Sequence, residues 1–254
     1  LVGSEMCIRD RYYGAKDFEN LRKSLAHSYR LTAFIAAGVF ILSQSFASLV
    51  LTGLHTPSNI IGMSLLYLRI IFCGIPATAA YNMFASALRA MGNSKTPLTA
   101  MIIASVLNVS LDILFVAGFG WGVAGAAIAT VIAQSFSAVY CFLILCRIDI
   151  VHLTRADFMP ASGMNARLMK LGIPVVFQNI IIGVGGLVVQ YVINGYGFLF
   201  VAGFTATNKL YGLLEMAAIS YGYAIVTYVG QNLGAGKIDR IRNCLLYTSP
   251  SPRD

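Results

Sequence analysis

Asp112 is the acidic residue whose surroundings most strongly suggest chemistry. It lies in a long apolar stretch, four positions after Asn108 and seven after Ser105, so the three side chains share one face of a helix. A carboxylate beside an amide carbonyl suits a hard cation such as Na⁺, and a carboxylate alone can carry a proton. The alternative is interhelical hydrogen bonding, by which polar side chains hold apolar helices together.

A second polar stripe occupies the next apolar stretch. Thr130, Gln134 and Ser137 follow one another at intervals of four and three residues, which places them on one helix face. We predict Gln134 as a candidate contact for a substrate or a proton. Hydrogen bonding between helices is again the alternative.

Glu215 is the second acidic candidate. Asn208, Tyr211 and Glu215 fall on one face of a helix at intervals of three and four residues. Such a carboxylate could attract a cationic substrate or exchange a proton. The alternative is a salt bridge across helices to Arg69 or Lys209.

Two prolines interrupt apolar stretches. Pro76 and Pro174 each stand in the tripeptide Gly-Ile-Pro. Proline removes one backbone donor and kinks a helix, which membrane proteins tolerate where neighbours satisfy the freed carbonyl. A hinge between conformational states and a static kink are both consistent with this pattern.

The helices that hold these residues can be predicted from the stretches of sequence that lack charged side chains. The chain has 254 residues, of which 57% are hydrophobic and 11% are charged, against about 25% charged in soluble domains. Asp, Glu, Lys and Arg are absent from 31–68, 70–88, 113–146, 171–208 and 216–236. A bilayer-spanning helix needs about 20 apolar residues. These stretches exclude a water-soluble globule.

Clusters of Gly, Pro, Asn and Ser divide the charge-free stretches into six predicted spans. Such clusters end helices. The expected fold is all-α, a polytopic transmembrane helix bundle, with spans at 31–53, 62–88, 97–118, 122–145, 170–194 and 200–229.

Basic residues indicate the orientation. Alternate breaks between the spans carry thirteen Lys and Arg residues, whereas the breaks at 54–61, 118–122 and 194–199 carry none. Cytoplasmic loops retain positive charge, so both ends of the sequence are expected in the cytoplasm. This asymmetry accounts for the net charge of +8, and we therefore predict no nucleic-acid partner.

A short internal repeat suggests a duplicated architecture. The segment 14–22, Gly-Ala-Lys-Asp-Phe-Glu-Asn-Leu-Arg, recurs at 234–242 as Gly-Ala-Gly-Lys-Ile-Asp-Arg-Ile-Arg. Transporters are often built from two structural repeats. The arrangement predicts the last four helices of one half followed by the first two of the next, in a protein of twelve helices.

Several motifs in order resemble one known family. The segments 12–17, 87–97, 107–112, 122–130, 170–174 and 229–236 closely resemble the MATE (multidrug and toxic compound extrusion) family. The resemblance covers about 12–243 and implies helices three to eight of a fold with two six-helix lobes. It also implies a cation site in the N-lobe that uses Asn108, Asp112 and Thr130, together with an Asp of the first helix.

The resemblance divides the chain into segments. The last four helices of the N-lobe are expected at 12–146, a cytoplasmic inter-lobe linker at 147–169, and the first two helices of the C-lobe at 170–243. The termini, 1–11 and 244–254, look like non-native sequence translated from sequencing adapters. We expect a chain with six of twelve helices to be inactive by itself.

The resemblance implies a secondary active antiporter in the plasma or inner membrane. It would export amphipathic organic cations in exchange for Na⁺ or H⁺. No cofactor and no metal other than Na⁺ are expected. The full-length protein would be a monomer surrounded by membrane lipid. The first alternative is a lipid-linked precursor flippase of the same superfamily. An intramembrane enzyme or a structural membrane subunit is the alternative of another class, although Asp112 is the only acidic residue between Glu19 and Asp149.

Overall fold

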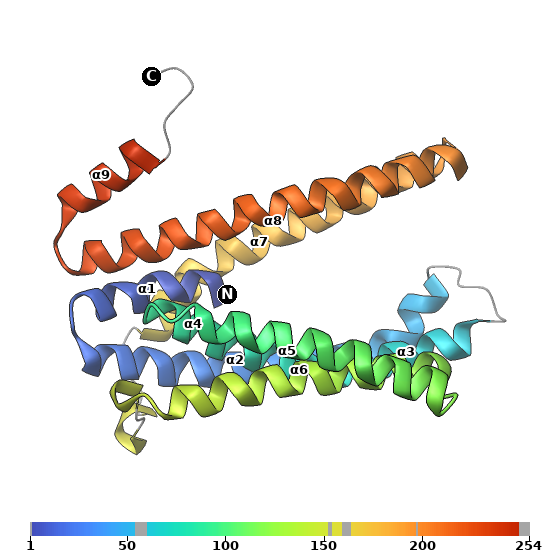
Figure 1. Ribbon diagram of the computed structural model, residues 1–254, viewed down its shortest axis with the longest axis horizontal. Coiled ribbons are helices and arrows are strands. Elements are labelled where there is room, and N and C mark those ends of the chain that lie inside the picture. Colours follow the sequence, from blue (N-terminus) through green and yellow to red (C-terminus); the bar gives the residue numbers. More distant parts are fainter. Residues whose placement is uncertain (1, 54–59, 152–153, 159–163, 197, 249–254) are drawn as a thin grey trace. The chain divides into compact units, whose positions relative to one another are not determined.

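Helices account for all regular structure in the described part of the chain. A computed structural model describes residues 2–53, 60–151, 154–158, 164–196 and 198–248 (Figure 1). In chain order the elements are α1 (Val2–Gly14), α2 (Phe18–Gly53), α3 (Ile61–Cys73), α4 (Ile75–Ala90), α5 (Lys95–Asp112), the π-helix η1 (Ile113–Gly118), α6 (Gly122–Cys146), the 3₁₀ turns η2 (Asp149–Val151) and η3 (Arg155–Phe158), α7 (Met164–Asn194), α8 (Phe198–Gly234) and α9 (Ile238–Thr248).

Six helical stretches of the described residues are long and apolar enough to cross a membrane. They are Phe18–Gly53, Ile61–Ala90, Lys95–Gly118, Gly122–Cys146, Leu168–Ile193 and Gly203–Gly234. The predicted number and order of spans are confirmed, as is the all-α class. Most of the predicted break at 54–61 lies outside the described residues.

The helix of the first span is longer than predicted at its N-terminal end. It begins at Phe18, whereas the charge-free stretch begins at 31. The added turns carry an ion pair between Lys23 Nζ and Glu19 Oε1 at 2.5 Å, four residues apart. They also bury Leu21 and Leu25. Charged residues therefore continue the helix beyond its apolar part.

The second span contains two helices separated at Gly74. The Gly74 N–H donates to Ile71 O at 2.9 Å, and the Thr78 N–H donates to Gly74 O at 2.9 Å. Pro76 lies in the first turn of α4, where its missing N–H costs no helical hydrogen bond. The helix is thus interrupted at Gly74, two residues before the proline. The sequence predicted instead a single helix with a kink at Pro76.

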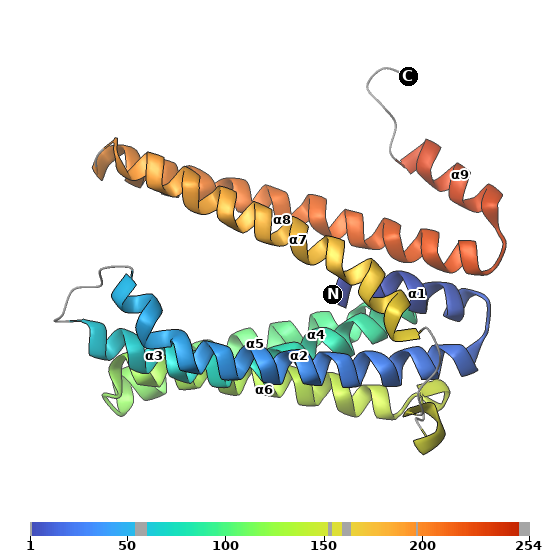
Figure 2. The ribbon, with the colours of Figure 1, turned by 180° about the vertical axis from the view of Figure 1, so that it is seen from behind.

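The chain divides into two compact units. One comprises Phe18–Pro160, and the other comprises Leu1–Asp17 with Ala161–Asp254. In the first unit α6 packs against α3, α4 and α5, and α2 packs against α3 and α4 (Figures 1 and 2). In the second unit α1 packs against α7 and α8, and α9 packs against the end of α8.

The helix contacts of the first unit are built mainly from small side chains. Ala85, Ala100, Ala127 and Ala129 are completely buried, as expected where helices of a membrane protein approach closely. Large apolar side chains point outward instead, and Phe34 is 80% exposed. An apolar exterior over a core of small residues is the arrangement of a bundle surrounded by lipid.

The sequence repeat is also a structural repeat in the second unit. A Cβ atom added to Gly14 would collide with the backbone of Gln231, and one added to Gly234 would collide with the backbone of Arg11. Both glycines, and both of their partners, are separated by the repeat offset of 220 residues. The ends of α1 and α8 therefore cross in a reciprocal contact.

The two turns after these helices have matching hydrogen bonds and dihedral angles. Lys16 has φ of 58° and its counterpart Gly236 has φ of 69°. The matching backbone bonds are Ala15 N to Arg11 O and Ala235 N to Gln231 O, Lys16 N to Tyr13 O and Gly236 N to Leu233 O, and Asp17 N to Tyr12 O and Lys237 N to Asn232 O.

Candidate functional site

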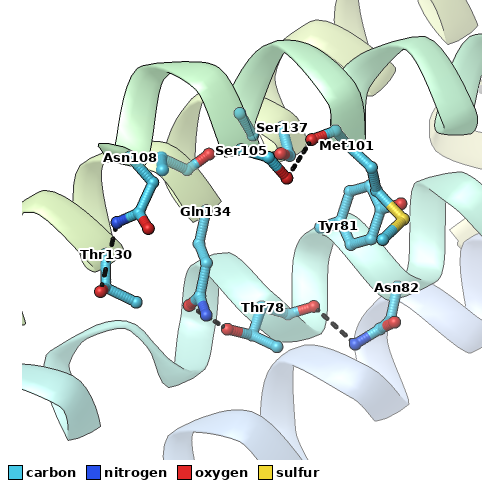
Figure 3. Close-up of a pocket in the computed structure, with 11 residues that line it drawn as sticks. Thr78, Tyr81, Asn82, Met101, Ser105, Asn108, Thr130, Gln134 and Ser137 are labelled. Carbon is cyan, nitrogen blue, oxygen red and sulfur yellow. Dashed lines mark hydrogen bonds between the residues drawn. The ribbon is translucent and has the colours of Figure 1, made fainter. Parts of the chain in front are cut away.

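A pocket of about 350 Å³ lies among α4, α5 and α6 of the first unit (Figure 3). Within each helix the lining residues follow the pattern i, i+3, i+4, so one face of each helix turns toward the pocket. The lining residues are Thr78, Tyr81 and Asn82 of α4, Met101, Ala104, Ser105 and Asn108 of α5, and Thr130, Ala133, Gln134 and Ser137 of α6.

Members of both polar stripes identified in the sequence line this pocket, although Asp112 of the first stripe does not. Asn108 Nδ2 donates to Thr130 Oγ1 at 3.4 Å, and Figure 3 shows the two side chains pointing toward one another. The Thr130 hydroxyl donates in turn to Ala126 O of its own helix at 3.0 Å. Asn108 Oδ1 is the amide atom left to accept a hydrogen bond or to ligate a cation.

Asp112 lies one helical turn beyond Asn108 and is not among the residues that line the pocket. Its side chain is half-buried, and its Oδ1 atom is buried without a hydrogen-bond partner among the described residues. A buried carboxylate oxygen without a partner is costly. Carboxylate, amide and hydroxyl oxygens fit a hard cation, and a proton would satisfy the same atom.

Gln134 connects the pocket to the break between α3 and α4. Thr78 Oγ1 lies 2.5 Å from Gln134 Oε1 and 3.1 Å from Gly74 O. A Cβ atom at Gly74 would stand 3.2 Å from Gln134 Oε1. The wall of the pocket is therefore joined to the point where the second span changes helix.

The α4 contribution is missing from the sequence prediction. Thr78, Tyr81 and Asn82 are polar residues at intervals of three and one in an otherwise apolar helix. That spacing places them on one face and is the signal that could have identified them. No charged residue lines the pocket, so its polarity comes from hydroxyl and amide groups.

The remaining predicted residues lie elsewhere. Asn208, Tyr211 and Glu215 are exposed on α8 in the second unit. Within the described residues, no ion pair joins Glu215 to Lys209. Pro174 lies inside α7, which continues from Met164 to Asn194. On α3, the backbone carbonyl of Arg69 accepts a hydrogen bond from Gln44 Nε2 at 2.9 Å.

Comparison with known proteins identifies the family. The sequence profile of the MatE family matches residues 10–114 and 174–249, together more than half of the chain. The chain belongs to the MatE family. It is thus a multi-pass membrane protein of a family of transporters, not an enzyme.

Two relatives come from Bacillus subtilis strain 168. The probable multidrug resistance protein YpnP is 36% identical over 208 residues, which are 82% of this chain and 45% of that protein. The probable multidrug resistance protein YoeA is 28% identical over 96% of this chain and 54% of its own length. This MatE chain thus spans about half the length of the curated relatives it matches.

Solved structures share the fold. A crystal structure of MATE in the bent conformation superimposes with a TM-score of 0.88 at 22% sequence identity. The match covers 97% of this chain and 55% of that one. The partial MATE fold expected from the sequence is therefore confirmed.

Proposed function

We propose that this MatE chain is part of a secondary active multidrug exporter. The names of its relatives support export of drugs. The observation that carries the proposal is the pairing of Asn108 with Thr130, one turn from a carboxylate with a buried, unpartnered oxygen. This group of oxygen atoms lies beside a pocket of about 350 Å³ that has polar walls.

The coupling ion in this proposal is Na⁺ or H⁺ moving inward, bound at Asp112, Asn108 and Thr130. Binding there favours the access state in which the carboxylate is satisfied, because a ligand shifts a conformational equilibrium by its differential affinity. Efflux of the substrate is driven by that shift. No cofactor takes part.

The proposed substrates are amphipathic organic cations. Tyr81 and Met101 offer apolar and aromatic surface within the polar pocket, which suits an aromatic cation. Gln134 would contact the substrate, and the face of α8 with Asn208, Tyr211 and Glu215 would supply a substrate or proton site. We further propose a monomer in the plasma membrane with residues 18 and 237 on the cytoplasmic side.

The flippase alternative is less well supported. A carrier of anionic lipid-linked precursors would need a cationic cavity. The described pocket has neither Lys nor Arg in its lining, and Arg69 and Lys209 lie outside it.

The variant Asp112→Asn in the full-length protein tests the proposal. Efflux of a fluorescent cationic dye from right-side-out vesicles should fall at least tenfold under both an inward Na⁺ gradient and an inward H⁺ gradient, because the amide cannot take up a proton or balance the charge of a cation. The control is Ser110→Ala, because Ser110 is exposed and bonds only Val106 O of its own helix. Unchanged efflux in Asp112→Asn would refute the coupling role.

A further inference from the structure

A second cavity, of about 570 Å³, lies on the opposite side of α4 from the polar pocket. Its lining follows α2 from Tyr29 to Phe40 and α4 from Pro76 to Phe84. The side chains are mostly small or aromatic, such as Ala37 on α2 and Phe84 on α4. Phe158 of η3 lines it as well. We refer to this cavity as the α2–α4 groove.

The walls of the α2–α4 groove are apolar. The Thr32 hydroxyl, one of its few polar groups, is within hydrogen-bond distance of Met83 Sδ at 3.7 Å. The ring of Phe84 packs against the rings of Tyr29 and Phe142, with centroids 5.7 and 5.2 Å away. A polar solute would gain nothing from such walls, whereas a hydrocarbon chain would.

The length and place of the groove match one leaflet of a bilayer. From Tyr29 to Phe40 the helix axis advances about 16 Å at a rise of about 1.5 Å per residue. That is close to half of the ~30 Å hydrocarbon core. Both α2 and α4 belong to helices that are apolar enough to span a membrane. The apolar molecule present at this depth is a lipid acyl chain.

One end of the groove carries a cation. Arg30 is exposed, and its Nη1 donates to the carbonyl oxygen of Phe158 at 3.0 Å. The guanidinium therefore stands at the end of the groove where Phe158 lies, with other N–H groups free of any described bond. Arginine binds phosphate well because its donors form a planar fork.

The nearby carboxylate does not cancel this charge. Asp157 accepts bonds from Thr154 N at 2.7 Å and Thr154 Oγ1 at 2.8 Å. It also pairs with Arg22 Nε at 3.9 Å. Arg30 is thus left to attract an anion, and the cytoplasmic leaflet holds anionic lipids.

We propose that the α2–α4 groove binds an anionic phospholipid of the cytoplasmic leaflet. One acyl chain lies along α2 between Tyr29 and Phe40, and Arg30 contacts the phosphate. This lipid contacts the face of α4 opposite Thr78 and Asn82, so the same helix touches bound lipid on one side and the polar pocket on the other.

Lipid retention in native mass spectrometry tests the charge contact. The chain is released from nanodiscs that contain equal amounts of phosphatidylglycerol and phosphatidylcholine. The unsubstituted chain should retain phosphatidylglycerol preferentially, and Arg30→Gln should lower that preference at least fivefold. Arg147→Gln is the matched control, because Arg147 is exposed after the end of α6 and does not line the groove.

A second pair of variants tests the acyl-chain contact. Ala37→Phe fills the groove and should reduce retention of both lipids, whereas Val39→Phe, two residues away and not in the lining of the groove, should not. Circular dichroism checks that all variants remain helical. Equal retention by Arg30→Gln and Arg147→Gln, or by the two Phe variants, would overturn the proposal. Absence of retained lipid on the unsubstituted chain would overturn it too, since another segment would then cover the groove.

Discussion

The carboxylate of Asp112 lies where the helix changes its winding. Asp112 is the last residue of α5, and the π-helix η1 begins at the next position. In the wider turns Phe119 N–H reaches back five residues to Leu114 O at 2.9 Å. Such π-turns are rare and often occur at functional sites. The irregular backbone is therefore an independent reason to assign a function to Asp112.

At the residue scale, Asp157 gives a pH-dependent prediction. Burial acts to raise the pKa of its carboxyl group, but the two hydrogen bonds from Thr154 and the charges of Arg22 and Lys23 outweigh burial and lower it. Because the pKa of this group is depressed in the folded protein, the carboxylate stabilises the fold around Thr154 at pH values above its ordinary pKa of 3.8. That contribution is lost as the pH falls through the folded pKa.

Hydrogen exchange of the Thr154 amide checks this prediction. After correction for the intrinsic rate, exchange should accelerate as the pH falls below about 4, where the carboxylate is protonated. Asp157→Asn should accelerate it about tenfold at neutral pH, the equivalent of ~1.4 kcal/mol for a bond to a charged group, and should abolish the acid transition. Asp239→Asn, exposed on α9, is the control. A transition that persists in Asp157→Asn would contradict the assignment.

The helical spacing in the sequence drew attention to some of the residues that line the pocket and missed others. Asn108, Thr130, Gln134 and Ser137 stand at helical intervals, and the structure brings all four to one pocket. Spacing could not show that Asp112 lies outside the lining of the pocket. It indicates which face of a helix a residue occupies, but not how the neighbouring helices lie against that face. Which roles these residues perform stays a prediction.

At the element scale, the break between α3 and α4 depends on the absence of a side chain. A Cβ atom at Gly74 would stand 3.0 Å from Ile71 O, 3.1 Å from Val131 Cγ2 and 3.2 Å from Gln134 Oε1. All three contacts are tight, and α6 supplies two of them. Close packing of α3 and α4 on α6 therefore requires glycine here.

The variant Gly74→Ala measures that requirement. It should destabilise the protein by about 1–2 kcal/mol through overpacking, and it should separate Gln134 from Thr78. The control is Gly62→Ala in the first turn of α3, which has nothing within 4 Å of an added Cβ and should change the stability by no more than about 0.5 kcal/mol. Thermal unfolding in detergent compares the two. Equal melting temperatures would show that the contact is relaxed at no cost.

Charge-free length predicted the spans but not their internal structure. Apolar residues continue on both sides of Gly74, so neither hydropathy nor charge marks the break there. The sequence of η1, Ile-Leu-Phe-Val-Ala-Gly, likewise contains nothing that distinguishes a π-helix from an α-helix. Both features depend on packing against α6, which only tertiary structure reveals.

At the scale of the whole molecule, the repeat makes a comparison within one chain possible. Lys16 and Gly236 occupy matching turns with positive φ, and only glycine adopts that conformation without steric cost. Lys16→Gly should therefore stabilise its turn by about 1 kcal/mol, and Gly236→Lys should destabilise its turn by a similar amount. Thermal unfolding measures both shifts. Shifts of the same sign would contradict the equivalence of the two turns.

The predicted boundaries of the segments remain a prediction. The compact units separate after Asp17 and after Pro160, whereas the sequence suggested divisions at 11, 146, 169 and 243.

Asp10, in the stretch expected to be non-native, is buried against Gly230. Burial raises its pKa to about 7 despite the opposing charge of Arg9. A carboxyl group in that position is costly to ionise at neutral pH.

The reciprocal contact of Gly14 and Gly234 has the geometry of a symmetric homodimer interface within one polypeptide. In such an interface residue i meets residue j while j meets i. In a homodimer every substitution appears twice, so its cost is doubled and neither copy can differ from the other. Within one chain each copy mutates alone. Lys16 and Gly236 already differ in this way. Both have a positive φ, which is strained for lysine but not for glycine.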